Sequence, residues 1–226
     1  ISNLQVVLTA LDGTSVPTAP FTADANTRLL MNFTDGAVID NTGKNNLETQ
    51  DNTIVSPYIK KFGNGSVLFS GETLAMTTTT NLNLALGSGE FTVEFWFYSD
   101  TANAAQGFMG SYSAGWWFQY FGKWQFGYSN TAIIDHTQAY DAKQWYFIAV
   151  TRDSSNVVGL YIDGTRVSNA TNTTDLVVGS TFAIGGINTS GTRDATAKLD
   201  EVRITKGVAR YTGTSHVVPT RAFKNR

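Results

Sequence analysis

Apolar and polar residues alternate with a period of two along most of this chain, and turn residues interrupt the pattern at short intervals. Residues 91–98, FTVEFWFY, place four large apolar side chains on one face of an extended strand. Residues 144–151, QWYFIAVT, are apolar on both faces, which is typical of a central strand covered on both sides. An Asp163-Gly164 pair between two further apolar runs predicts a tight hairpin, because glycine accepts the positive φ that the turn needs.

No segment carries a convincing amphipathic helical period, and the one helical turn that the sequence predicts covers residues 206–211. Many short strands separated by turns are typical of an all-β fold. We therefore expect two antiparallel sheets packed as a sandwich. Further strands are expected at 28–33, 66–70, 116–121, 124–128, 157–162, 165–167, 182–185 and 198–205.

The composition of the 226 residues excludes several classes of protein. Hydrophobic residues make up 42% and charged residues 15%, which is enough apolar surface for a sizeable core. A net charge of −2 without a cluster of Lys and Arg gives no support to nucleic acid as a partner. The absence of cysteine excludes disulfides, thiolate metal sites and a cysteine nucleophile. The longest apolar runs have the length of a strand, so we expect no membrane insertion.

A short segment near the start of the chain is similar to one near its end, and this similarity bears on domain organisation. Residues 16–21, VPTAPF, resemble residues 218–223, VPTRAF, about 200 residues further on, which is the length of one such sandwich. Similar segments at both edges are expected at the junctions of a tandem array, and coincidence between two Pro/Thr-rich loops is the alternative. We therefore expect residues 1–20 to be a linker or the tail of a preceding unit, and residues 21–226 to form one β-sandwich domain.

Several segments, in order, resemble the laminin-G-like jelly-roll domains of the concanavalin A-like lectin/glucanase superfamily. They are 63–71 (GNGSVLFSG), 90–97 (EFTVEFWF), 145–152 (WYFIAVTR), 160–164 (LYIDG) and 199–211 (LDEVRITKGVARY). The resemblance covers roughly residues 22 to 222, and its closing stretch is similar to copies in phage and marine-virus structural proteins. It implies a jelly roll of two curved sheets in a virion or cell-surface protein, of a kind that usually binds and does not catalyse.

Because the superfamily includes glucanases, the first candidate is a pair of catalytic carboxyl groups. Those enzymes carry a Glu-x-Asp-x-Glu strand or a close variant, and retaining hydrolysis needs two carboxyl groups about 5 Å apart. Here Glu90 and Glu94 share a face, but no Asp lies between them. Asp200 and Glu201 are adjacent and are predicted to point to opposite faces. Neither histidine lies near a recognisable nucleophile motif. We expect no enzymatic activity.

The resemblance also implies a calcium ion at the rim of the sandwich. Calcium takes six to eight oxygen ligands, which Asp, Asn and Gly-rich loops supply. Asp35 and Asp40 lie early in the domain, and Asp200 lies on a strand that would pair nearby, so these three residues are the candidate metal ligands. The alternative, which we favour, is that Asp35 and Asp40 are turn residues whose side chains close Asx-turns.

An aromatic-rich strand is the candidate carbohydrate-binding site. Residues 115–124 hold three of the five tryptophans, and aromatic platforms commonly cover the apolar face of a sugar. One face of this strand must belong to the core, and the sequence does not show which. We favour core positions for its aromatic residues over a ligand platform, and the alternative hypothesis is that an aromatic residue on the solvent-facing side contacts glycan. The candidate residues are Trp116, Trp117, Gln119, Tyr120 and Trp124.

Together these observations predict a non-catalytic binding or structural module of a larger protein, located on a virion (in a tail fibre, spike or capsid decoration) or on a cell surface. Its expected partners are other virion or surface-protein subunits and host-surface carbohydrate, and a homo-oligomer is suggested only by analogy with fibres. A purely structural module that packs against neighbouring subunits is the alternative. A glycan-cleaving enzyme is a third reading, which the missing carboxylate triplet argues against.

Overall fold

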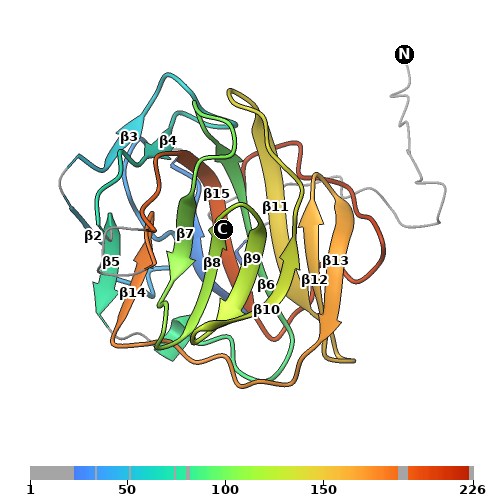
Figure 1. Cartoon of the computed structure of the whole chain (residues 1–226). Helices are drawn as coiled ribbons and strands as arrows, with labels where there is room; N and C mark the ends of the chain where they lie inside the picture. The colour runs from blue at the N-terminus through green and yellow to red at the C-terminus, as the bar shows by residue number, and fades with distance from the viewer. Residues whose placement is uncertain are drawn as a thin grey trace, which may run out of the picture.

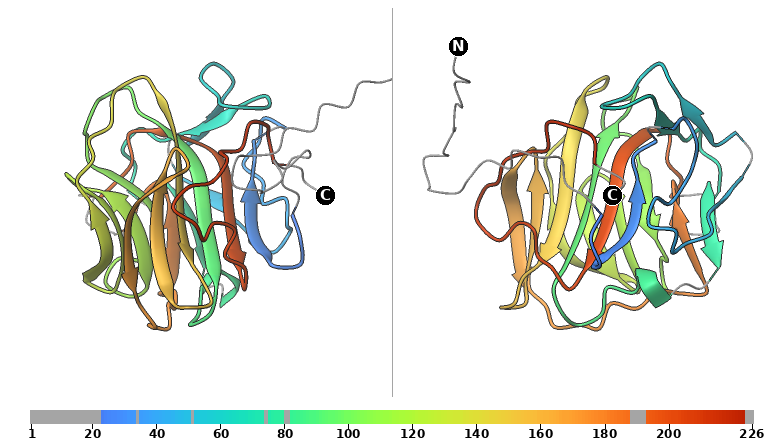
Figure 2. Two further views of the ribbon diagram at one scale, coloured as in Figure 1. Left: turned by 90° about the vertical axis from the view of Figure 1, so that its right-hand side faces the viewer. Right: turned by 180° about the vertical axis from the view of Figure 1, so that it is seen from behind.

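The computed structural model describes residues 23–33, 35–50, 52–73, 75–79, 82–187 and 193–223. The expected linker at 1–20 and the VPTAPF segment lie outside these residues. The described strands form two antiparallel sheets that pack face to face, and the views in Figures 1 and 2 show the two layers. The all-β sandwich expected from the sequence is confirmed.

The first sheet has eight strands in the order β13-β12-β11-β6-β15-β4-β3, with β1 paired to β15. Strand β15 pairs with β6 along one edge, and its other edge is shared by β4 and β1. The strands are β1 (Thr27–Met31), β3 (Ile54–Ser56), β4 (Ser66–Leu68), β6 (Phe91–Tyr98), β11 (Trp145–Arg152), β12 (Val157–Ile162), β13 (Thr165–Thr171) and β15 (Lys198–Lys206).

The second sheet has seven strands in the order β10-β9-β8-β7-β14-β5-β2, and it faces the viewer in Figure 1. A short 3₁₀ turn, η1 (Leu82–Leu84), precedes β6 in the chain. The strands are β2 (Glu48–Thr49), β5 (Met76–Thr79), β7 (Gln106–Gly110), β8 (Trp116–Tyr120), β9 (Trp124–Tyr128), β10 (Thr131–His136) and β14 (Thr181–Ile184).

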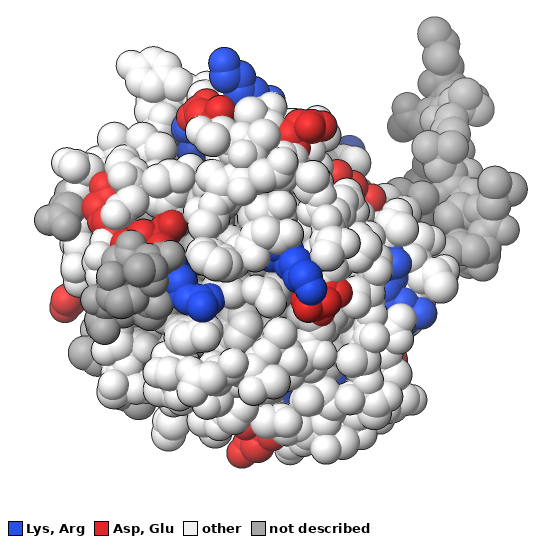
Figure 3. All heavy atoms as spheres, in the orientation of Figure 1, with Lys and Arg blue, Asp and Glu red and all other residues white. Residues whose placement is uncertain are grey.

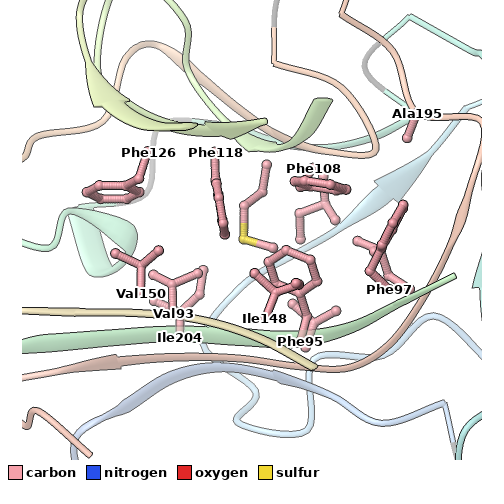
Figure 4. Packing of buried hydrophobic residues seen from close by; sticks show 14 of the residues in the cluster. Val93, Phe95, Phe97, Phe108, Phe118, Phe126, Ile148, Val150, Ala195 and Ile204 are labelled. Atoms are coloured by element: carbon pink, nitrogen blue, oxygen red, sulfur yellow. The ribbon is translucent and has the colours of Figure 1, made fainter. Parts of the chain in front are cut away.

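The core lies between the two sheets and is rich in aromatic side chains. Figure 4 shows Phe108, Phe118 and Phe126 of the seven-stranded sheet facing Phe95 and Phe97 of the eight-stranded sheet. The Phe95 and Phe108 ring centroids are 5.1 Å apart, and Phe108 lies 5.5 Å from Phe118. Interlocking rings of this kind bury a large apolar area and fix the two sheets against each other.

The residues after β15 cross the outer face of the eight-stranded sheet, where "outer" means turned away from the core. The carbonyl of Tyr211 accepts from the hydroxyl of Thr151 at 2.8 Å, and the N–H of His216 donates to the carbonyl of Gly164 at 2.8 Å. The segment ends at Phe223, which is 1% exposed. We call residues 207–223 the C-terminal strap.

The strap corrects one prediction from the sequence. Residues 206–211 contain no helical turn: Lys206 ends β15, and Gly207 turns the chain at φ +84°. The hydroxyl of Thr92 then donates to the carbonyl of Val208 and accepts from the N–H of Arg210. These contacts to β6 replace the hydrogen bonds that a helix would make. No helix in the described part of the chain is long and apolar enough to cross a membrane.

Candidate functional site

Both faces of β8 are buried, so the hypothesis of a solvent-facing aromatic platform is wrong and the favoured interpretation of these residues as core is confirmed. Trp116 and Tyr120 point into the core with Trp124 of β9, and all three are at most 3% exposed. Their polar atoms are also satisfied: the Trp116 indole donates to the Leu84 carbonyl at 2.8 Å. Large rings on a strand between two sheets are held as core residues because the area they bury stabilises the sandwich.

Trp117 lies on the outer face of β8 and is nevertheless only 2% exposed. Its ring lies over Gly127 of β9, where a Cβ atom would come within 2.2 Å of the indole. The indole N–H donates to the carbonyl of Ser129 at 2.6 Å, and the Tyr112 ring packs 5.3 Å away. Trp117 therefore covers the sheet and offers no ring face to a sugar.

Gln119, the fourth residue of β8, is the centre of a polar arrangement on the same outer face. Its side-chain amide donates to Oε1 of Gln125 at 2.8 Å, and the two residues are register partners on β8 and β9. Its own Oε1 accepts from the guanidinium of Arg193. We call these three residues, Gln125, Gln119 and Arg193, the polar ladder. Gln119 is 3% exposed, while Gln125 and Arg193 are half-buried.

Arg193 reaches the ladder from a hairpin that folds over the sheet. The carbonyl of Gly185 accepts from the N–H of Ala195 at 2.9 Å, and Gly186 pairs with Asp194. This hairpin crosses β7 at Gly107, where a Cβ atom would lie 1.8 Å from the Arg193 carbonyl oxygen. A glycine is therefore required at position 107 for the hairpin to lie on the sheet and place Arg193 beside Gln119.

Aromatic rings flank the guanidinium. Arg193 Cζ lies 4.0 Å from the Tyr112 ring centroid, and Nη2 donates to the Tyr112 hydroxyl at 3.3 Å. The ring of Phe121, in the turn between β8 and β9, lies 5.3 Å from Arg193 Cζ and is 53% exposed. An exposed aromatic ring beside planar amide and guanidinium groups is the combination that sugar-binding sites use.

Charged groups are few on this side of the molecule. Figure 3 shows it as largely uncharged, with isolated acidic and basic groups. Next to the polar ladder, Lys123 Nζ forms an exposed ion pair with Asp135 Oδ2 at 3.2 Å, and Asp135 is the register partner of Gln125. A polar hollow of about 560 Å³ is lined by Asn52 and residues 70–73. It lies near the hairpin, because the hydroxyl of Thr73 donates to Asp194 at 3.2 Å.

Sequence reasoning found Gln119 and missed the other residues of this site. Gln125 alternates with the core residues Trp124 and Phe126, so its outward direction is readable from the strand pattern. Phe121 is the last residue of the predicted strand 116–121 and stands next to Gly122, and a glycine between two predicted strands is also a readable signal of a turn. Arg193 lies 74 residues from Gln119 in the chain, and no local pattern links the two.

The expected calcium ligands do not fit a metal ion. Asp40 is buried. Its carboxylate accepts from the backbone N–H groups of Leu30, Lys44 and Asn45 and from the side-chain amide of Asn45. It also accepts from the N–H and the hydroxyl of Thr42. A carboxylate has about four lone-pair sites, so these donors fill it. The contact from the N–H of Thr42 closes an Asx-turn, as the turn interpretation of Asp40 predicted. Asp35 is exposed in a turn. Among the residues the structure describes, no group of three or more His, Cys, Asp or Glu side chains could hold a metal.

Asp200 is likewise occupied by donors. Its Oδ2 accepts from the N–H groups of Lys61 and Phe62 at 2.9 and 3.1 Å, and Oδ1 accepts from the N–H of Glu201 at 2.8 Å. Burial raises the pKa of Asp200 to about 7, against the lowering effect of these hydrogen bonds. A carboxyl group with these partners is part of the fold's hydrogen bonding and is not arranged to bind a cation.

Asp200 and Glu201 do not point to opposite faces, which corrects the prediction from strand alternation. The register between β15 and β6 shifts between Asp200 and Arg203, and Glu201 has φ +52°. This β-bulge inserts one residue, so Glu201 also faces outward and its Oε2 accepts from the N–H of Phe223. Burial raises the pKa of Glu201 to about 9. Both carboxyl groups lie beneath covering chain, not in an open groove.

Of the other two carboxylates considered for catalysis, Glu90 is half-buried and Glu94 is fully buried. Arg203 Nη2 lies 2.6 Å from Glu94 Oε1, and both side chains are 0% exposed. The Tyr211 hydroxyl donates to Glu94 Oε2, and the neighbouring carboxylate raises the Tyr211 pKa together with burial. Glu94 thus ties the C-terminal strap to β6 and β15 and has no access to a polysaccharide.

A lectin-like β-sandwich with a polar and aromatic outer surface is what the fold and the site define. A family model described as the concanavalin A-like lectin/glucanases superfamily, laminin-G type, matches residues 70–210. The chain belongs to this superfamily. No curated protein sequence matches it.

Solved structures with the same fold include two binding domains and one domain of an extracellular arabinanase. The binding domain of Paraclostridial Mosquitocidal Protein 1 gives a TM-score of 0.62 at 13% identity, over 88% of this chain and 50% of that one. Domain 4 of AbnA, an extracellular GH43 arabinanase of Geobacillus stearothermophilus in complex with arabinotriose, gives 0.60 at 16%, over 83% and 95%. The botulinum neurotoxin DC binding domain, in complex with rat synaptotagmin II, gives 0.61 at 14%, over 81% and 49%. This chain thus spans about half the length of the toxin domains.

Proposed function

We propose that this chain is a non-catalytic glycan-binding module of a larger extracellular, cell-surface or virion protein. The observation that carries the proposal is the outer face of the seven-stranded sheet, where the polar ladder adjoins the exposed ring of Phe121. The fixed amides supply directed hydrogen bonds to hydroxyl groups, and the ring supplies an apolar surface for a sugar. The virion context is supported by the resemblance of residues 206–211 to phage structural proteins.

The similar arabinanase domain supports the glycan class of ligand, because it has the size of this chain and its structure contains arabinotriose. The absence of catalysis is supported by three of the four carboxylates considered for it, since Glu94, Asp200 and Glu201 are all 0% exposed, which leaves Glu90 without a second accessible carboxyl group from that set. A group that protonates a glycosidic oxygen has to touch the substrate. The rate of reducing-end release from polysaccharides therefore tests this part of the proposal, and measurable release would overturn it.

The site is tested by a glycan array probed with the chain and two variants, Phe121→Ala and Gln125→Ala. We expect each substitution to lower affinity for the bound glycan by roughly five- to tenfold, because a stacking contact or a directed hydrogen bond is lost. Tyr58→Ala is the matched control, since Tyr58 is 91% exposed in the loop that follows β3 of the other sheet. Equal binding by all four proteins would place the site elsewhere.

A module that packs against protein neighbours is the second candidate, and exposed apolar residues at one sheet edge favour it. Ile54 of edge strand β3 is 54% exposed, and Tyr58 follows in the next loop. Exposed apolar side chains on an edge strand are suited to contact with another subunit. The array separates the two candidates: the structural module binds no glycan, and replacing Ile54 and Tyr58 then weakens its association with the particle or surface protein.

A further inference from the structure

Arg193 has no carboxylate partner among the described residues, whereas several other cations are paired. Lys198 pairs with Asp100 at 2.7 Å, Arg210 with Asp24 at 3.0 Å, and Lys123 with Asp135. Arg28 and Arg166 also make no ion pair among the described residues, but they lie on β1 and β13 of the eight-stranded sheet. Arg152 is fully buried and donates to backbone carbonyls such as those of Gly89 and Thr174. Arg193 is therefore a half-buried cation on the proposed binding face whose charge is not neutralised there.

The guanidinium is held in place by neutral groups. The Tyr112 ring supports one side of its plane at 4.0 Å, and its two hydrogen bonds go to the Gln119 carbonyl oxygen and the Tyr112 hydroxyl. A guanidinium has five N–H donors, so further donors stay available for a ligand. Because the planar group is already fixed, little conformational entropy is lost when it binds a second partner.

The direction of the ladder puts donors at both of its ends. Arg193 donates to Gln119, and Gln119 in turn donates to Oε1 of Gln125. The side-chain oxygen of Gln125 accepts the hydrogen bond from Gln119. Among the described residues, the amide N–H₂ group of Gln125 therefore remains available to donate to a ligand. A site that ends in a fixed guanidinium and an amide N–H₂ group is suited to oxygen acceptors, and most strongly to anionic ones.

From these contacts we infer that the ligand is an acidic sugar, whose carboxylate or sulfate binds Arg193 while its ring lies against Phe121. This rests on the proposed glycan-binding function. Arg193 forms charge-assisted hydrogen bonds to the anionic group, and the Gln125 amide donates to a neighbouring oxygen of the sugar. The chain's net charge of −2 gives no general attraction for polyanions, so recognition depends on this local cation.

The test compares sugars of one backbone that differ only in charge. Binding of the whole chain to polygalacturonate oligosaccharides is measured by calorimetry beside their methyl esters, and dextran sulfate beside dextran. Arabino-oligosaccharides serve as a neutral probe of the site. In one of the two pairs we expect the acidic sugar to bind about ten- to a hundredfold more tightly than its neutral counterpart. A preference in the polygalacturonate pair identifies a carboxylate as the anion, and a preference in the dextran sulfate pair identifies a sulfate.

Arg193→Ala should remove this preference, and Arg193→Lys should restore only part of it, because lysine lacks the planar fork. Arg221→Ala is the matched control, since Arg221 is exposed on the C-terminal strap. Unchanged melting temperatures verify that the variants fold. Acidic binding that survives in Arg193→Ala overturns the inference. If only neutral sugars bind and Phe121→Ala loses that binding, the inference is overturned but the proposed function is retained. Binding of no sugar overturns both.

Discussion

At the scale of single residues, the tryptophans show how burial decides a role. Trp116, Trp117 and Trp124 are each at most 2% exposed, and each indole N–H donates to a backbone carbonyl. A buried indole with its donor satisfied stabilises the sheet through both its area and its hydrogen bond. The residues left for recognition are those with a partly exposed face, Phe121, Gln125 and Arg193.

Trp116→Ala is therefore expected to destabilise the fold by about 3–5 kcal/mol, because it empties a core position and leaves the Leu84 carbonyl without its donor. Chemical denaturation measures the effect. Tyr58→Ala, at a 91% exposed position, should stay within about 0.5 kcal/mol of the parent. A Trp116→Ala variant as stable as the Tyr58 control would contradict the core assignment.

At the scale of elements, the bulge in β15 brings two acidic side chains under the covering chain. Asp200 receives three backbone N–H groups, and Glu201 receives that of Phe223 at the end of the C-terminal strap. Oε1 of Glu201 is buried and makes no hydrogen bond among the described residues. The bulge thus anchors the loop at 61–62 and the strap, and burial of the two carboxyl groups raises their pKa values.

Raised pKa values make stability depend on pH with a definite sign. An acid whose pKa is higher in the folded state binds more protons there, so stability is fully present below its ordinary pKa and falls as pH rises through the folded value. For Glu201 the window runs from about 4.5 to about 9, and for Asp200 from about 3.8 to about 7. Burial lowers the pKa of His216, so this residue changes the stability only below about pH 6.5. Between pH 7 and pH 9 the change in stability is therefore assigned to Glu201.

We expect the free energy of unfolding to fall between pH 7 and pH 9, with a slope that approaches about 1.4 kcal/mol per pH unit. Glu201→Gln should flatten this slope, because the amide does not titrate and its oxygen can still accept from Phe223. Glu90→Gln is the control, at a half-buried position outside the bulge. Denaturation curves at several pH values test the prediction; a slope retained in Glu201→Gln would refute it.

At the scale of the whole molecule, donors of the chain itself engage two of the carboxylates that were expected to bind calcium, Asp40 and Asp200. Asp40 fixes its loop to β1 through the N–H of Leu30, and the donors around it have the geometry of an Asx-turn. In the same sheet, Glu94 and Arg203 bind the C-terminal strap through Tyr211 and Phe223. Hydrogen bonds supplied by the chain itself occupy the positions at which a calcium site was expected.

The melting temperature should accordingly be the same in EDTA and in added calcium. For a domain of this size a loss of 1 kcal/mol would shift the melting temperature by about 2–4 °C, which calorimetry resolves. Magnesium in place of calcium is the control for ionic strength. A fall in EDTA that only calcium reverses would show that a calcium site lies elsewhere in the chain.

The sequence by itself determined the fold class, because side-chain alternation with a period of two specifies which faces of β6, β11 and β15 meet in the core. It also placed the Asp163-Gly164 hairpin, whose turn chemistry is local. It could not reveal the bulge at Glu201, since one inserted residue turns the later side chains over without changing composition.

Only the tertiary structure decided which residues form the candidate site. The two faces of β8 have similar composition, and the hairpin that carries Arg193 decides what covers the outer one. Its contact with Gly107 and Gln119 joins segments far apart in the chain, so no window of sequence contains it. Local pattern specifies strands and faces, whereas coverage of a face depends on packing between distant segments.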